Sequence, residues 1–180
     1  LLCNKGDYDG AEPLYRRSLE ISEKVLGPEH PSTATTLSNL GLLLCNKGDY
    51  DGSEPLYRRS LEIKEKVLGP EHPDTANALS NLGGLLSDKG DYDAAEPIYR
   101  RSLEIREKIY GLKDPKTLRD LQNYGVLLRD LSRYDEALII LKKSDDGQKA
   151  VYGANSLERS YPLSALGQTE FLLKNLKAAE

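Results

Sequence analysis

The chain repeats itself every 42 residues, and this internal repeat constrains the fold more than any other feature of the sequence. Residues 6–47 and 48–89 are identical at 34 of 42 positions, residues 90–131 form a diverged third copy, and residues 132–173 form a degenerate fourth copy. Two markers keep the register without any gap: Tyr8, Tyr50, Tyr92 and Tyr134, and Gly27, Gly69, Gly111 and Gly153. Such a period predicts one solenoid domain over residues 1–180, in which each unit packs against its neighbours.

Each copy contains two segments with the apolar spacing of amphipathic helices. In the second copy, the first helix is predicted from about Tyr50 to Leu68. Gly69 and the prolines that follow it end this helix. Asp74 and Thr75 are candidates for the cap of the second helix, which is predicted to end at about Asp88.

Composition and charge narrow the class of protein. The chain has eleven tyrosines, one phenylalanine and neither tryptophan nor methionine, which suits the thin layered core of a solenoid. A net charge of -4 argues against nucleic-acid binding. No apolar run approaches the roughly 18 residues of a membrane span, and no signal peptide is visible. Because the chain begins with Leu1 and its last residues fall where a new first helix would start, we expect it to be part of a longer array.

The two cysteines, Cys3 and Cys45, occupy the same place in successive copies. Neighbouring packed helices have axes roughly 8–10 Å apart. A disulfide requires Cα atoms within about 7 Å. We therefore expect free thiols and a reducing, cytoplasmic location.

The second helix of each copy carries two stripes of different character. One stripe is apolar and predicted to face the core, and it consists of Leu37, Leu40, Gly41 and Leu44. A glycine inside a helix costs about 1 kcal/mol relative to alanine. The recurrence of Gly41 as Gly83, Gly125 and Gly167 therefore predicts close approach of a neighbouring helix. The other stripe is small and mostly polar, and it consists of Thr35, Ser38, Asn39, Leu42, Cys45 and Asn46.

The motifs resemble those of tetratricopeptide repeats over essentially the whole chain. They are Asn39-Leu40-Gly41, the Gly48-Asp49-Tyr50 turn, the small residue Ser53, and Leu56-Tyr57-Arg58-Arg59-Ser60. The usual tetratricopeptide period is 34 residues. The longer 42-residue form, with its Leu-Gly-Pro-Glu-His-Pro linker, resembles the repeats of kinesin light chains and of their bacterial and cyanobacterial relatives. HEAT or armadillo arrays, with periods of about 40–47 residues, are the alternative architecture, but the Gly-Asp-Tyr turn favours tetratricopeptide repeats.

The resemblance implies an all-α, right-handed superhelical solenoid of antiparallel helix pairs whose second helices line a concave groove. It also implies that the asparagines of the Asn-Leu-Gly motif bond the backbone of a bound peptide, and these positions are Asn39, Asn81 and Asn123. The fourth copy departs from the pattern with Ala165. An asparagine offers both a donor and an acceptor, so a row of them suits an extended peptide of any sequence.

Further candidate contacts lie on the same polar stripe. Four of the eight differences between the first two copies fall there, which indicates either a tunable surface or free drift of exposed positions. The third copy adds arginines, which favour carboxylate ligands. We therefore predict a protein or peptide ligand that carries acidic and apolar groups. The candidate residues beside the asparagines are Thr35, Ser38, Asn77, Ser80, Arg119, Gln122 and Arg129.

The sequence favours a protein-interaction module, acting as an adaptor or scaffold, over an enzyme. His30 and His72 lie in linker turns without further metal ligands, and no nucleophile elbow, phosphate loop or His-Glu-x-x-His motif is present. No catalytic residue, metal or cofactor is predicted. Two alternatives stay open, namely a scaffold that self-associates through its repeat ends and a regulatory or sensor module of a larger protein.

The fourth copy is atypical. Asp145 replaces a core leucine, Gly147 replaces an isoleucine, and Pro162 lies near the start of the second helix. This copy is either a cap that shields the last apolar face or a decayed repeat. A bend or a shortened helix is predicted near Gly147.

Overall fold

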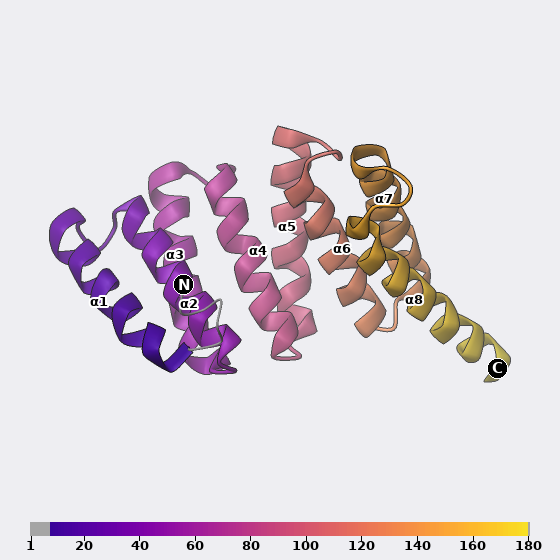
Figure 1. The fold of residues 1–180 in the computed structure, drawn as a ribbon, viewed down its shortest axis with the longest axis horizontal. Helices are drawn as coiled ribbons and strands as arrows, with labels where there is room; N and C mark the ends of the chain where they lie inside the picture. Colours follow the sequence, from indigo (N-terminus) through magenta and orange to yellow (C-terminus); the bar gives the residue numbers. More distant parts are fainter. Residues whose placement is uncertain (1–7, 180) are drawn as a thin grey trace. The chain divides into compact units, whose positions relative to one another are not determined.

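The computed structural model describes residues 8–179, and these residues form eight α-helices and one short 3-10 helix, with no strand among them (Figure 1). The chain divides into two compact units, Leu1–Gly90 and Asp91–Glu180. Unit 1 contains α1 (Tyr8–Leu26), α2 (Pro31–Asn46), α3 (Tyr50–Leu68) and α4 (Pro73–Asp88). Unit 2 contains α5 (Tyr92–Tyr110), α6 (Pro115–Asp130), α7 (Tyr134–Tyr152), η2 (Leu157–Arg159) and α8 (Ser160–Ala179). Within each unit, consecutive helices pack against each other.

The turns follow from a few residues that repeat. Gly69, with a φ of 100°, ends α3 in a conformation that side chains with a Cβ rarely adopt. Gly48, with a φ of 82°, precedes α3, and the Asp49 carboxylate then accepts a 2.9 Å hydrogen bond from the backbone N–H of Gly52. The predicted bounds of both helices in the second copy are confirmed.

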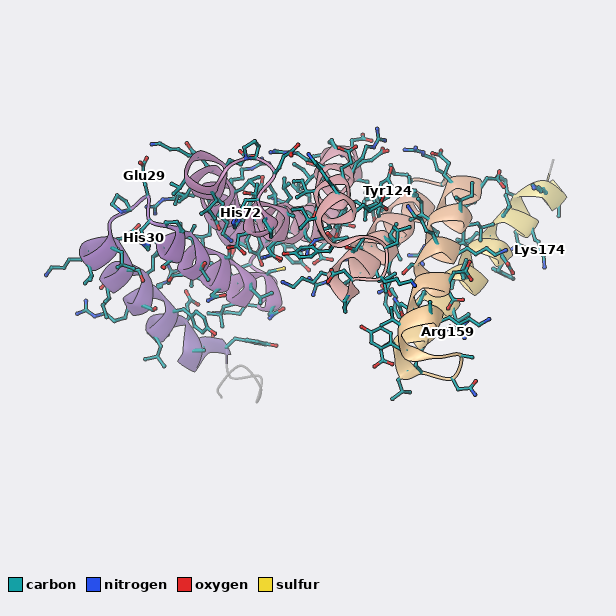
Figure 2. The ribbon with its side chains drawn as sticks, turned by 90° about the horizontal axis from the view of Figure 1, so that it is seen from above. Glu29, His30, His72, Tyr124, Arg159 and Lys174 are labelled. Carbon is teal, nitrogen blue, oxygen red and sulfur yellow. The ribbon has the colours of Figure 1, made fainter. Side chains whose placement is uncertain are left out.

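The predicted cap of the second helices is wrong. His72, rather than Asp74 or Thr75, is the N-cap of α4, and its Nδ1 accepts a 3.1 Å hydrogen bond from the Asp74 N–H. His30 does the same for α2, and both histidines are labelled in Figure 2. Histidine was missed because it is not among the preferred capping residues. The third copy has Asp114 at this place, and its carboxylate accepts from two backbone N–H groups.

The apolar stripe faces the core as predicted. Leu37, Leu40, Gly41 and Leu44 are all buried. A Cβ added to Gly41 would lie 3.1 Å from the Tyr57 ring, and one added to Gly125 would lie 2.7 Å from Leu141 side-chain atoms, so close approach is confirmed at both glycines. At Gly167 the prediction is wrong, because an added Cβ would meet nothing within 4 Å.

The fourth copy is less disrupted than predicted. Helix α7 spans 19 residues, as do α1, α3 and α5, so it is not shortened at Gly147. The Leu118 side chain occupies the space above Gly147. Asp145 is buried and accepts two 2.7 Å hydrogen bonds from the Arg159 guanidinium, which explains how a carboxylate replaces a core leucine.

Helix α8 is longer than the other second helices. It runs from Ser160 to Ala179 without a break, so the expected new helix at the end of the chain is not present in the described residues. Lys174 stands where Gly48 and Gly90 make left-handed turns, and nothing at this place favours such a turn. In the part of the chain that the structure describes, no helix has the length and apolar character that crossing a membrane requires.

Candidate protein-binding face

In unit 1, the polar stripe lies on the side of α2 and α4 that the core leaves uncovered. Asn39 on α2 and Asn81 on α4 are both exposed, and neither side-chain amide forms a hydrogen bond within residues 8–179. Leu42, which lies on α2 three residues after Asn39, is 52% exposed. The Cys45 thiol donates a weak 3.8 Å hydrogen bond to the Asp88 carboxylate, which places the stripes of the two helices side by side. We call this surface the unit 1 face.

Other predicted contact residues of the unit 1 face are partly engaged. Ser38 is 7% exposed, and its hydroxyl shares a 2.7 Å hydrogen bond with the Ser60 hydroxyl, which in turn donates to the Ala34 carbonyl. Ser80 is equally buried. Thr35 is exposed, and its hydroxyl donates to the Pro31 carbonyl at 3.2 Å. Ser38 therefore joins α2 to α3 at a buried position, whereas Thr35 lies at the surface.

Asn77 is half-buried near the start of α4. Its amide donates a 3.0 Å hydrogen bond to the Asp74 carboxylate. This bond ties the Asn77 side chain to the first turn of α4. The residue thus belongs to the edge of the unit 1 face rather than to its centre.

Lys64 lies on α3, which packs against both α2 and α4, and it was not among the predicted residues. Its side chain is 6% exposed, and it forms no hydrogen bond or ion pair with any described residue. Burial lowers the pKa of the Lys64 ammonium, and the more distant Asp74 carboxylate opposes this effect. A buried cation without a partner is unusual, because transfer of a charge out of water is costly.

The other copies show what this position normally does. Ser22 shares a 3.3 Å hydrogen bond with Thr36, fourteen residues later. Arg106 forms a 2.7 Å ion pair with Asp120, also fourteen residues later. In the second copy the corresponding partner of Lys64 is Ala78. Ser22/Lys64 and Thr36/Ala78 are two of the eight differences between the first two copies, so this coupled change was the signal that pointed to Lys64.

In unit 2, a hollow of about 350 Å³ brings two predicted residues together. Arg119 and Gln122 line it from α6, and Arg119 is exposed and has no ion pair among the described residues. The Gln148 amide donates to Gln122 Oε1 at 3.2 Å, but its own Oε1 is buried without a hydrogen-bond partner. The other lining residues are Pro115, Leu118, Tyr152, Leu157, Glu158, Ser160 and Tyr161. The hollow thus offers a cation, an unused acceptor and aromatic surface.

Two further predicted residues of unit 2 lie outside the lining of the hollow. Arg129 is partly buried and donates to Gln168 Oε1 at 2.7 Å and to the Asp130 carboxylate at 2.9 Å. Asn123 is half-buried, and its side-chain amide has no hydrogen-bond partner within the described range. Arg129 therefore connects α6 to α8, while Asn123 retains its bonding capacity.

The charges at the turn end of unit 1 are already paired. Lys89 contacts Asp51 at 2.7 Å and Glu54 at 2.8 Å, and Glu54 also accepts from Arg58. The hydrogen bond from Lys89 and that from Arg58 lower the pKa of the Glu54 carboxyl. These pairs link successive helices, so these charges are already engaged within the fold, unlike Asn39 and Asn81 on the unit 1 face. Among residues 8–179 there is no cluster of three His, Cys, Asp or Glu side chains that could hold a metal ion.

Comparison with known proteins places this geometry in a family. The family model described as Tetratricopeptide repeat matches residues 1–45, 34–108 and 76–146, which together cover most of the chain. No curated protein sequence matches it. Members of this family are generally protein-interaction modules and are typically non-catalytic.

Solved structures agree on the fold. A putative kinesin light chain from Podospora anserina with nearly identical TPR-like repeats superposes with a TM-score of 0.84 at 18% identity, covering 99% of this chain and 84% of that one. BtubC (BKLC) from P. vanneervenii superposes with a TM-score of 0.84 at 21% identity, covering 98% of this chain and 70% of that one. The apo form of RapI superposes with a TM-score of 0.82 at 17% identity, covering 99% of this chain and 62% of that one. The chain belongs to the tetratricopeptide repeat family, with the all-α solenoid fold of its kinesin light chain-like members.

Proposed function

We propose that the polar stripes of the second helices bind an extended segment of another protein, so that the chain serves as an adaptor or scaffold. One observation carries this proposal. Asn39 and Asn81 stand one repeat apart on neighbouring helices, and both side chains are exposed and without a hydrogen-bond partner among residues 8–179. A carboxamide pairs equally well with a backbone N–H and a backbone C=O, so repeated asparagines hold an extended chain irrespective of its sequence.

The surroundings of the asparagines suggest which side chains the bound segment carries. Leu42, which is 52% exposed, provides apolar surface on the unit 1 face. In unit 2, the free guanidinium of Arg119 suits a carboxylate through paired hydrogen bonds. A segment with both apolar and acidic residues therefore fits the face. A cytoplasmic location suits this role, and the free Cys45 thiol supports a reducing compartment.

Selection from a displayed library of random peptides tests the proposal. The wild-type chain is compared with a variant that combines Asn39→Ala, Asn81→Ala and Asn123→Ala. The control is Asn175→Ala, which removes an exposed asparagine on α8 outside the repeated motif. We expect the wild type and the control to enrich the same peptides and the triple variant to lose them.

Circular dichroism must show unchanged helicity in both variants before the selections are compared. Enriched peptides that the triple variant retains with equal affinity would exclude the asparagines as the binding residues. Failure of the wild type to enrich any peptide would argue against groove binding and favour the second candidate function.

The second candidate function is self-association through apolar helix faces. Ile21 on α1 is 49% exposed, whereas its counterparts Ile63 and Ile105 are 4% and 5% exposed. Phe171 on α8 is also 65% exposed. Two different apolar faces on one chain permit head-to-tail contacts between copies. Sedimentation over a range of concentrations tests this candidate: Ile21→Glu and Phe171→Glu should each abolish any concentration-dependent increase in mass, and a wild type that stays monomeric excludes it.

A further inference from the structure

The surroundings of Lys64 contain little negative charge. Helix α2, which packs against one side of α3, has no charged residue in its sequence. Helix α4, on the other side, carries Asp74 and Asp88. Asp88 interacts with Cys45 at the opposite end of the helix. Asp74 accepts from the Asn77 amide and has one oxygen 4.0 Å from His72 Nδ1. Neither carboxylate forms an ion pair with Lys64.

The position of Lys64 in the repeat shows where its side chain lies. Gln148, its counterpart on α7, lines the hollow of unit 2 between α6 and the start of α8 and bonds to Gln122 of α6. The α2 residue that corresponds to Gln122 is Ser38, whose hydroxyl is bound to Ser60 instead. Lys64 therefore reaches the floor of the unit 1 face, between α2 and α4, where no described side chain accepts a hydrogen bond from it.

The third copy shows which group is missing. The charge of Arg106 is balanced by the Asp120 carboxylate, which is fully buried and also accepts a hydrogen bond from the Ser102 hydroxyl. The second copy keeps a cation on the first helix but has Ala78 in place of the acid. We infer that a carboxylate from a bound protein segment takes the place of Asp120 in unit 1 and binds the Lys64 ammonium on the floor of the face between α2 and α4.

This inference rests on the proposed function and adds to it the partner's chemistry. An Asp or Glu side chain on a segment held by Asn39 and Asn81 would point down between the two helices. A charge-assisted hydrogen bond in a nearly dry site is worth more than one in water. It would also restore the charge balance that burial of Lys64 disturbs. Unit 1 would thus select segments with an acidic residue at one position.

The probe is the blocked peptide acetyl-Gly-Asp-Gly-amide, with acetyl-Gly-Asn-Gly-amide as its uncharged match. Carbon-13 NMR of the lysine side chains follows the titration of Lys64, whose signal is assigned by its absence in Lys64→Met. We expect the Asp peptide at millimolar concentration to raise the pKa of Lys64 and the Asn peptide to leave it unchanged. Lys64→Met should weaken binding of the Asp peptide roughly tenfold and leave that of the Asn peptide unchanged.

Ala78→Asp is the decisive variant because it gives the second copy the carboxylate that Asp120 provides in the third. It should raise the pKa of Lys64 without any peptide and remove the response to the Asp peptide. If wild-type Lys64 does not respond to the Asp peptide while the Asn39 and Asn81 amide signals shift, the inference is overturned and the proposed function stands. If Lys64 responds equally in an Asn39→Ala, Asn81→Ala variant, the inference stands and the asparagines lose their role.

Discussion

Lys64 on α3 and Arg106 on α5 occupy the same place in successive copies and are 6% and 1% exposed, but their surroundings differ. The Arg106 guanidinium lies 2.7 Å from the Asp120 carboxylate, whereas the residue that corresponds to Asp120 in the second copy is Ala78, which has no carboxylate. The helices around the two residues have the same lengths. The repeat therefore fixes where a side chain lies but not how its charge is balanced.

The comparison distinguishes charges that are paired inside the fold from charges that can still bind a ligand. In unit 2 the buried Arg106 is neutralised by its ion pair with Asp120, whereas Arg119 in the hollow has no ion pair with any described residue. In unit 1 the buried Lys64 ammonium has no ion-pair partner within the part of the chain that the structure describes. Equivalent positions can thus support the fold in one copy and remain open to a ligand in another, so motif matching alone does not assign their roles.

The largest expected effect comes from the same substitution at the two positions. Arg106→Met leaves Asp120 buried without its cation and should lower the free energy of unfolding by about 3–5 kcal/mol. Urea denaturation followed by circular dichroism measures this loss. The double variant Arg106→Met, Asp120→Leu should recover most of it, because an apolar pair is often as stable as a buried ion pair. A single variant as stable as the wild type would show that the pair does not matter for folding.

Glycines at one repeat position should also respond differently in different copies. Gly125→Ala forces a Cβ against Leu141, with side-chain atoms at 2.7 Å and the backbone N at 3.3 Å, and should cost about 1–3 kcal/mol. Gly167→Ala meets open space on α8 and should gain up to about 1 kcal/mol from helix propensity. Thermal denaturation of the two variants, compared with the wild type, measures the expected loss of stability and the expected gain. Equal effects would mean that the contact with Leu141 is not needed.

Lys64→Met should stabilise the protein, in contrast to Arg106→Met. Removal of an unpaired buried ammonium should add about 1 kcal/mol near pH 7. Because the folded pKa of Lys64 is lowered, the unfolded chain binds more protons between that pKa and about 10.4. Wild-type stability therefore rises with pH in this window, and the advantage of the variant shrinks. Urea midpoints of both proteins between pH 7 and pH 10.5 check this, and a destabilised variant would indicate an internal partner for Lys64.

The helices and the core were predictable from the sequence because they depend on local periodicity. The 42-residue register located α3 and α4, and the apolar stripe with Leu37 and Leu40 is buried as expected. The end of α8 was not predictable by counting repeats, since α8 continues through Lys174, at the place where Gly48, Gly90 and Ser132 adopt a positive φ. Register predicts an element only while the residues that terminate it are kept.

The candidate site was predictable only in part. Exposure of Asn39 and Asn81 followed from the helical stripe, but Ser38 lies at its border and turns inward to Ser60. Lys64 lies on the other helix of the repeat, so inspection of the second helices alone did not find it. The coupled differences Ser22/Lys64 and Thr36/Ala78 are visible in the sequence, but their meaning depends on the contact between these two positions in the other copies.

The smallest expected effect concerns the caps of α4 and α6, where the second and third copies again differ. His72→Ala removes the acceptor for the Asp74 N–H and should lower stability by about 0.5 kcal/mol. His72→Asp copies Asp114, whose carboxylate accepts from two backbone N–H groups, and should equal or exceed the wild type because a negative charge also suits a helix N-terminus. Urea midpoints at pH 7 distinguish the three proteins. If His72→Asp were less stable than His72→Ala, repulsion from the neighbouring Asp74 would outweigh the cap, and the two copies would not be interchangeable even at this exposed position.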